Sequence, residues 1–323
     1  MRMLNKVLTL AAAVGLCLTG ATANAADAYP SQTINMICSH GAGGDTDYNA
    51  RLISRMLEKK LGVSVVVNNV TGANGSIALT QYKDENPNGY TLIATNAMSL
   101  ASNEASGLSD FGYDSFEVVC VYGKQCGENL LVRADAPYSN LQELIDATKA
   151  EPESITLGIA MGGSSFIAAL IMQMDKGAQF AMVDAGGDGA ERMTSLLGGH
   201  IDVTIAPYTL AKEYIESGKV KSLCTLMSER LPATPDIPTA VESGVENLTI
   251  DTLYVILAPK GTPADIVEKV NAACLDIVNN DPEYAEAIKT FNFQDPYALS
   301  VKDSIEVLKA QREHMMSYSQ YLQ

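Results

Sequence analysis

Tryptophan is absent from this chain of 323 residues, histidine occurs three times, and 22 Lys and Arg stand against 38 Asp and Glu. The formal net charge is therefore −16. Because nucleic acids and anionic membrane surfaces attract basic proteins, so acidic a chain is not expected to bind either of them. A small anionic ligand stays compatible with this charge, because backbone N–H groups in a closed cleft act at short range while distant surface charge is screened.

Apolar runs long enough to span a membrane are also missing. Near the N-terminus, Arg2 and Lys6 accompany an apolar stretch over residues 7–18, and Ala23-Asn24-Ala25 fits the small-residue site of a signal peptidase. The stretch is shorter than the roughly 18 residues that a span needs. We therefore predict an export signal over residues 1–25, cleaved after Ala25, which leaves a mature chain of net charge −18 (−16 − 2). Cys17 follows a leucine too large for lipoprotein processing and belongs to the discarded signal.

Catalytic motifs are lacking too. The stretch Ser39-His40-Gly41-Ala42-Gly43-Gly44 follows a strand-like run and resembles the oxyanion loop of lipases and esterases, which makes a hydrolase the sharpest enzymatic alternative. Such an enzyme needs a serine in a Gly-x-Ser-x-Gly elbow, and the sequence contains none. Only His40, His200 and His314 could serve as a base. We expect no enzyme.

Metal, cofactor and redox motifs are equally scarce. No His-Glu-x-x-His, calcium-loop or Cys-x-x-Cys spacing occurs, and the glycines of residues 41–44 do not complete a dinucleotide fingerprint, so no cofactor or metal is expected. Five cysteines remain after the signal: Cys38, Cys120, Cys126, Cys224 and Cys274. Cys120 and Cys126 are the closest pair, so a disulfide between them is one alternative, and small buried apolar residues are the other.

What the sequence has is an alternation of strand-like and helix-like runs, long enough for two α/β lobes. We expect strands at 34–38, 63–67, 90–94, 117–122, 130–132, 156–159, 180–183, 201–205, 222–227 and 248–257. Helices are expected at 49–61, 76–83, 139–149 with a Ser139–Gln142 capping box, 166–174, 262–279, 282–290 and 301–321, and no regular structure over 98–114. The sheets should be mainly parallel.

Three glycine-rich loops follow strands and open helices, at residues 39–47, 160–165 and 184–189. Glycine lets the backbone approach a ligand closely, and the N–H groups at a helix start carry partial positive charge. In α/β folds ligands bind at the carboxyl ends of strands, where these loops fall. The sequence thus suggests anion cradles, with plain strand-to-helix turns as the alternative. A further polar loop, Thr95-Asn96-Ala97, follows another strand end.

The order of several motifs resembles the substrate-binding proteins of tripartite tricarboxylate transporters, the periplasmic Bug family. The matching stretches are 41–47, Thr71-Gly72-Ala73-Asn74-Gly75, Asn88-Gly89-Tyr90-Thr91-Leu92, 196–202, 235–239 and 258–263, together with Leu61-Gly62 and 65–69, nearly the whole mature chain. The resemblance implies a two-lobed periplasmic binding protein with lobe 1 at 26–128 and 250–323 and lobe 2 at 129–249. It implies a monomer that captures a small organic anion and delivers it to membrane permease subunits, with a ligand sensor for a signalling partner as the alternative.

The resemblance also implies that both lobes grip a carboxylate through loop N–H groups, hydroxyls and ordered water. The residues at the matching positions are Gly43, Gly44, Asp45, Thr46 and Asp47 from one lobe, and Gly162, Gly163, Ser164 and Ser165 from the other. We add Asn96 and Asp188 from the loops, and Tyr254 as an aromatic wall, for which core packing is the alternative and Tyr48 and Tyr208 are the other candidates.

Asp45 stands where the family commonly has a glycine or serine, and Gly186-Gly187 replace a common Tyr-Lys pair before the third loop, so Asp45 and Asp188 are expected near a pocket with few cations. Because carboxylates repel a second anion, these aspartates suggest a ligand that carries an amine or several hydroxyls beside its anionic group. Helix capping is the simpler reading of both side chains. Ser39-His40 also replaces the proline and aromatic residue that the family often has before its first glycines.

Overall fold

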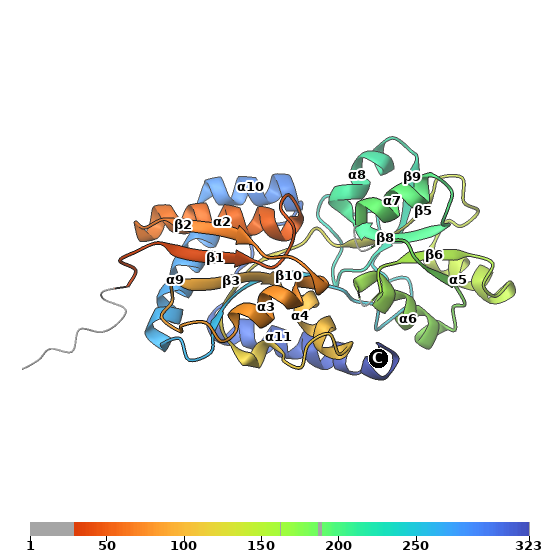
Figure 1. The fold of residues 1–323 in the computed structure, drawn as a ribbon. Coiled ribbons are helices and arrows are strands. Elements are labelled where there is room, and N and C mark those ends of the chain that lie inside the picture. The colour runs from red at the N-terminus through yellow and green to blue at the C-terminus, as the bar shows by residue number, and fades with distance from the viewer. Residues whose placement is uncertain (1–28, 162, 187–188, 323) are drawn as a thin grey trace, which may run out of the picture.

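The computed structural model describes residues 29–161, 163–186 and 189–322. The predicted signal peptide, Gly162 and Asp188 lie outside these ranges, so the interpretations placed on them stay predictions. Figure 1 shows two lobes side by side, each with its own sheet and flanking helices. In the described part of the chain, no helix is long and apolar enough to cross a membrane.

The sheet of the first lobe has the strand order β2-β1-β3-β10-β4 within the described residues. Its strands are β1 (Ile34–Cys38), β2 (Val65–Asn69), β3 (Thr91–Asn96), β4 (Phe116–Lys124) and β10 (Leu253–Pro259). β1 pairs in parallel with β2 and β3, whereas β10 pairs antiparallel with β3 and β4. β10 is the strand that returns from the other lobe, so it enters the sheet from the opposite end.

The second sheet repeats this plan, with the order β7-β6-β8-β5-β9 in the region described. Its strands are β5 (Glu128–Arg133), β6 (Thr156–Ile159), β7 (Ala181–Asp184), β8 (Val203–Pro207) and β9 (Val220–Thr225). β5, the strand that enters from the first lobe, runs antiparallel to β8 and β9. Both sheets are therefore mixed: in each, the crossing strand, β10 or β5, runs opposite to the other strands, which share one direction as expected for mainly parallel sheets.

Helices cover both faces of each sheet (Figure 1). Beside the first sheet lie α2 (Asp45–Leu61), α3 (Ser76–Tyr82), α4 (Ala97–Ala105), α9 (Ala264–Asn280), α10 (Pro282–Asn292) and α11 (Val301–Met316). Beside the second lie α5 (Leu141–Ala150), α6 (Ser164–Lys176), α7 (Gly189–Leu197) and α8 (Tyr208–Glu216). The 3-10 turns η1 (Ala73–Gly75) and η2 (Tyr113–Ser115) and the terminal α12 (Ser319–Leu322) complete the elements.

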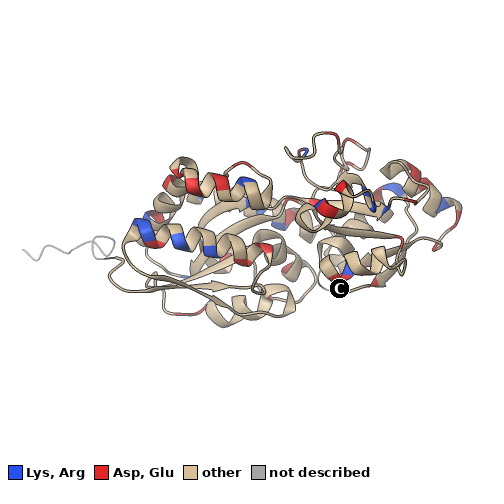
Figure 2. Ribbon diagram, turned by 90° about the horizontal axis from the view of Figure 1, so that it is seen from above, with Lys and Arg blue, Asp and Glu red and all other residues tan. Residues whose placement is uncertain are grey.

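α2 shows how local sequence sets these elements. Leu52, Ile53, Met56 and Leu57 recur at helical spacing and are buried against the sheet, which removes apolar area from water. The helix ends at Gly62, whose φ of 73° is a left-handed conformation that glycine adopts without steric cost. Figure 2 shows the charged residues mainly on helices and loops, with the strands largely uncharged.

The prediction of no regular structure over 98–114 is wrong, because α4 occupies the first part of that segment. In its sequence, Ala-Met-Ser-Leu-Ala-Ser-Asn-Glu-Ala, even the polar Ser99, Ser102 and Asn103 are buried, so the helix has no exposed charged face. Amphipathic spacing is a signal of half-exposed helices only. A second correction concerns α5, where Asn140 and not Ser139 is the N-cap and accepts a 2.9 Å hydrogen bond from the Glu143 N–H.

The two lobes share one buried apolar cluster on the side of α4 and the end of α11. Met98 and Ala101 of α4 and Met315 of α11 lie in the same cluster as Leu144 and Ile167 of the second lobe. Figure 1 shows α11 extending under the first lobe toward the second. The apolar contact therefore fixes one side of the boundary between the lobes, opposite the polar residues described below.

The five cysteines that the structure describes are all buried and none forms a disulfide. Burial raises the pKa of the thiols of Cys126 and Cys224 to about 12, so both are protonated and unreactive at neutral pH. The structure therefore has these cysteines as small buried apolar residues and shows no disulfide between Cys120 and Cys126.

Candidate functional site

A cleft of about 540 Å³ lies between the lobes and is lined from both of them. The first lobe contributes residues 40–46, Asn74, Asn96, Met98, Ser99 and Ser102; the connections and the second lobe contribute Gln125, Glu128, Ala160, 163–165, Gly189, Ala190, Arg192, Pro207, Leu210 and Thr252. The lining includes the starts of α2, α6 and α7, together with residues of α4. The predicted residues Gly43, Gly44, Asp45, Thr46, Asn96, Gly163, Ser164 and Ser165 are thus brought together.

The first-lobe glycine loop ends in a helix start without a side-chain cap. Gly44 is the N-cap of α2, and no side chain accepts a hydrogen bond from the first turn at this cap. The Thr46 N–H has no acceptor among the described residues. Gly43 has a φ of 85°, which turns the chain sharply into the helix. The loop therefore presents backbone donors to the cleft, where an anion gains from both the N–H groups and the helix dipole.

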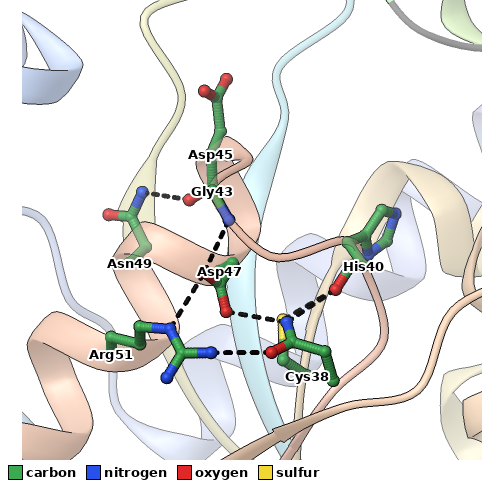
Figure 3. Close-up of polar contacts among 8 residues, drawn as sticks. Cys38, His40, Gly43, Asp45, Asp47, Asn49 and Arg51 are labelled. Atoms are coloured by element: carbon green, nitrogen blue, oxygen red, sulfur yellow. Dashed lines mark hydrogen bonds and ion pairs between the residues drawn. The ribbon is translucent and has the colours of Figure 1, made fainter.

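Asp47 braces this loop from behind and does not line the cleft. Its carboxylate accepts hydrogen bonds from the Gly43 N–H at 2.9 Å, Asn69 Nδ2 at 2.7 Å and Arg51 Nε at 3.0 Å (Figure 3). The side chain is buried, with 3% of the residue exposed. Burial alone would raise the pKa of Asp47, but the hydrogen bonds from Arg51, Gly43 and Asn69 together lower it. With all its bonds directed inside the first lobe, Asp47 is a positioning residue rather than the ligand contact that we predicted.

Asp45 points the other way. Figure 3 shows its carboxylate directed away from Asp47 and Arg51, and the residue lines the cleft. Gln125 Nε2 donates a 2.8 Å hydrogen bond to Asp45 Oδ2, so a residue of the connection between β4 and β5 holds the carboxylate. Gly44, not Asp45, is the N-cap of α2, so the capping alternative for Asp45 does not apply.

The second-lobe loop has a similar form. Gly163 is the N-cap of α6, again without a side-chain hydrogen bond, and the Ser164 N–H has no acceptor in the ranges that the structure describes. Ser165 Oγ accepts a 2.8 Å hydrogen bond from the Ala160 N–H, so this hydroxyl closes the loop. Ser164 Oγ donates to Glu128 Oε1 at 3.4 Å. Two uncapped helix starts from different lobes therefore open on the same cleft.

Polar side chains around His40 form another part of the cleft wall. Asn96 caps α4 by accepting from the Ser99 N–H at 2.7 Å, and its Nδ2 lies 3.2 Å from His40 Nε2. His40 Nδ1 lies 2.8 Å from Ser39 Oγ. Burial lowers the pKa of His40 to about 4, so the ring is neutral at pH 7. Neutral His40 therefore adds no charge to the cleft wall, and both of its ring nitrogens contact protein groups, with Nε2 also 3.2 Å from Ser99 Oγ.

Glu128, Arg192 and Gln125 also line the cleft, and the sequence reading did not name them. Arg192 is 4% exposed and donates to the carbonyl oxygens of Gly186 and Ile205. Arg192 lies in the first turn of α7, directly after the third glycine loop, and this position in the sequence is a signal from which a cleft residue could have been predicted. Glu128 is the first residue of β5 and carried no comparable signal.

Tyr254 does not form a wall of the cleft. It is 1% exposed in the core of the first sheet, and its hydroxyl has no hydrogen-bond partner among the described residues. Of the other candidates, Tyr48 stacks on Phe291 and Tyr208 contacts Phe293 edge to face. No described tyrosine lines the cleft, so the expectation of an aromatic wall is wrong, and the simpler reading as core packing is right for Tyr254. Sequence order placed Tyr254 at the return to the first lobe, but the strand turns this side chain inward.

The described residues contain no group of three or more His, Cys, Asp or Glu side chains that could hold a metal ion. Two lobes of mixed α/β structure, joined by crossing strands and enclosing a polar cleft, define the class of two-lobed solute-binding proteins. Residues 49–317 match the model of the tripartite tricarboxylate transporter family receptor, TctC, and the chain belongs to this family. It is a substrate-binding protein and not an enzyme.

Similar proteins agree with this assignment. The chain is 31% identical over 294 residues to a UPF0065 protein in the gbd 5'region of Cupriavidus necator, covering 88% of this chain and 86% of the relative. The structure of the periplasmic binding protein BugD is 27% identical, covers 91% of this chain and 98% of its own, and superposes with a TM-score of 0.74. MatC of Rhodopseudomonas palustris, solved with bound malate, shares the fold at 23% identity, with 91% and 100% coverage and a TM-score of 0.73.

Proposed function

We propose that this protein captures a small organic anion, with a carboxylate as its anionic group, between its two lobes. The uncapped starts of α2 and α6 carry the proposal. They belong to different lobes and open on one cleft, and the N–H groups of Thr46 and Ser164 lack an acceptor among the described residues. A carboxylate lying between them would accept from both lobes at once. Arg192 adds a buried positive charge to the same cleft.

Capture of this kind couples binding to closure. An open form offers one helix start, and closure brings the second to the same carboxylate and excludes water. A ligand favours the closed form only through the contacts that it gains there, and donors from the second lobe supply those contacts. The radius of gyration measured by small-angle scattering should therefore fall when ligand saturates the protein. An unchanged value would contradict this motion.

The protein would act in the periplasm after removal of residues 1–25, as a monomer that hands its ligand to the membrane subunits of a tripartite transporter. The family to which the chain belongs is named for such receptors, which supports this role over that of a sensor. Co-purification with the permease subunits encoded beside its gene would test the partnership. A gene next to a sensor kinase, without permease genes, would favour signalling instead.

The ligand is open to direct identification. Native mass spectrometry of gently purified protein should show a bound species of the mass of a small organic acid, which denaturation releases. Isothermal titration calorimetry with malate, the ligand of the fold neighbour MatC, provides a first added probe. If no ligand is retained and no organic acid binds, the proposed function is wrong.

Ser164→Pro tests the backbone donor itself. Proline is tolerated at the first helical position, and Gly163 already has the extended conformation (φ −89°, ψ 176°) that precedes a proline. The substitution removes the Ser164 N–H while α6 can still form. We expect it to weaken binding of the retained acid about tenfold, by roughly 1.4 kcal/mol, the contribution of one charge-assisted hydrogen bond. Ser164→Ala removes only the hydroxyl and is the control; equal losses in both variants would exclude the N–H as the cause.

A further inference from the structure

Glu128 is a buried carboxyl group with one oxygen left without a partner. The residue is 6% exposed and lines the cleft. Ser164 Oγ donates to Oε1 at 3.4 Å, but Oε2 has no hydrogen bond within the part of the chain that the structure describes. A buried polar atom of this kind costs free energy unless something satisfies it. Because the Glu128 side chain lines the cleft, we expect a bound ligand to supply the missing donor.

The charges around Glu128 favour a cation as that donor. Glu128 faces Asp45 at the start of α2 and Arg192 on α7, with Ser164 on α6 and the neutral Cys126 and Tyr254 as the other titratable or polar neighbours. Arg192 does not form an ion pair with Glu128 within 4.0 Å in the described structure, because its N–H groups donate to backbone carbonyls. Among the described residues, the charges that act on Glu128 are the Asp45 carboxylate and the Arg192 guanidinium, so two carboxyl groups and one arginine meet at this end of the cleft.

Gln125 carries a second unsatisfied atom at the same place. Its Nε2 is committed to Asp45, whereas its Oε1 is buried without a partner in the residues described. Oε2 of Glu128 and Oε1 of Gln125 are both acceptors, and the side chains that carry them are three residues apart and line one cleft. A group with several N–H donors and a positive charge meets both needs, since an ammonium has three donors and no acceptor.

We propose that the cleft has a cation subsite formed by Glu128, Asp45 and Gln125, and that the natural ligand is a zwitterion that carries an ammonium group as well as its carboxylate. The proposal rests on the proposed function, because the carboxylate of this ligand occupies the helix starts of α2 and α6. The two ends of the ligand then meet opposite charges. An unsubstituted dicarboxylate would instead bring a second anion toward Glu128 and Asp45.

Protonation of Glu128 gives the subsite a defined pH dependence. Burial raises the pKa of Glu128 to about 7, with the charge of Asp45 adding to the rise and Arg192 opposing it. Only the ionised carboxylate attracts an ammonium group. Between pH 6 and pH 8 the ionised fraction in the empty cleft rises about tenfold, so affinity for an aminated acid should rise by about the same factor. Affinity for an acid without an amine should not rise.

The experiment compares matched acids with and without an amine. Binding of succinate and aspartate, and of butanoate and 4-aminobutanoate, is measured by isothermal titration calorimetry at pH 6, 7 and 8 on the wild type and on Glu128→Gln. Glu306→Gln is the control, because this substitution also removes one carboxylate, but from an exposed residue on α11 whose Oε1 lies 3.8 Å from Lys302 Nζ. We expect at least one aminated acid to bind tenfold or more tightly than its partner at pH 8. Glu128→Gln should remove both this preference and the pH dependence, and Glu306→Gln neither.

Other outcomes overturn the inference. If simple carboxylates bind and amination brings no gain, or if Glu128→Gln keeps the preference, the cation subsite is wrong while the proposed function stands. The same holds if affinity for an aminated acid falls from pH 6 to pH 8, because ionised Glu128 should attract its ammonium group. If neither class of acid binds, both proposals fail.

Discussion

Gln125 Nε2 donates a hydrogen bond of 2.8 Å to Asp45 Oδ2 and so joins the connection between the lobes to the first-lobe glycine loop. Gln125 lies between β4 of one sheet and β5 of the other, and Asp45 is the first residue of α2. The direction of the Asp45 carboxylate therefore depends in part on the segment that connects the two lobes.

Gln125→Ala should loosen Asp45 and weaken ligand binding. Without the Gln125 hydrogen bond the Asp45 carboxylate is held less firmly, and we expect a loss of affinity of about three- to tenfold, equivalent to roughly 1 kcal/mol. The affinity of both proteins is measured by calorimetric titration with the ligand that was identified from the purified protein. Gln142→Ala is the control, because Gln142 donates a similar 2.9 Å hydrogen bond to Asp146 on exposed α5. Equal effects of both variants would disprove the link to the cleft.

Asp47→Asn should destabilise the fold and flatten its acid dependence. An amide cannot accept three donors as an anion does, so we expect a loss of about 2 kcal/mol in the free energy of unfolding at pH 7. The pKa of Asp47 is lower in the folded state than in the unfolded state, where it is near 4. Asp47 therefore contributes to the free energy of unfolding above pH 4, and this contribution is lost as the pH falls through its folded-state pKa. Urea unfolding between pH 7 and pH 3 measures both effects. Asp146→Asn, on the surface of α5, should change stability by less than about 0.5 kcal/mol.

Gly43→Ala should strain the loop backbone without a steric clash. An added Cβ would meet no atom within 4 Å, but φ is +85°, where alanine costs about 1 kcal/mol relative to glycine. Gly177 at the end of α6 has a φ of +68° and equally open space, so Gly177→Ala should cost the same stability. Only Gly43→Ala should also weaken ligand binding, by about tenfold. A loss of binding in Gly177→Ala as well would show that destabilisation alone explains the effect.

His40 should make the fold sensitive to mild acid. Its pKa is about 4 in the folded state against about 6.5 in the unfolded state. The unfolded chain thus binds more protons between these values, so stability falls as pH drops from 6.5 to 4, by on the order of 3 kcal/mol in full. Urea unfolding at pH 7 and pH 5 should show a smaller loss for His40→Gln than for the wild type. His200→Asn, at an exposed histidine, should behave like the wild type.

Much of the architecture could be predicted from sequence because the signals are local. Glycines after strand-like runs identified the loops, helical spacing identified α2, and Pro263 marked the start of α9. The reversed directions of β5 and β10 could not be predicted in this way, since strand direction depends on where the chain crosses between lobes. Helix α4 was not predicted for another reason: it is buried on nearly all sides, polar residues included, so it lacks the contrast between an apolar and a charged face on which the prediction relies.

The order of motifs can be read from the amino-acid sequence, and it indicates the family and the two helix starts expected to meet an anion. The role of each side chain near those starts depends on the folded structure. Folding directed Asp47 behind the loop and Asp45 into the cleft, turned Tyr254 into the core, and brought Glu128 and Arg192 to the ligand side. These outcomes depend on which residues become neighbours across a sheet or between lobes. Burial and opposing charge then set the protonation of each group, and neither can be read from its position in the chain.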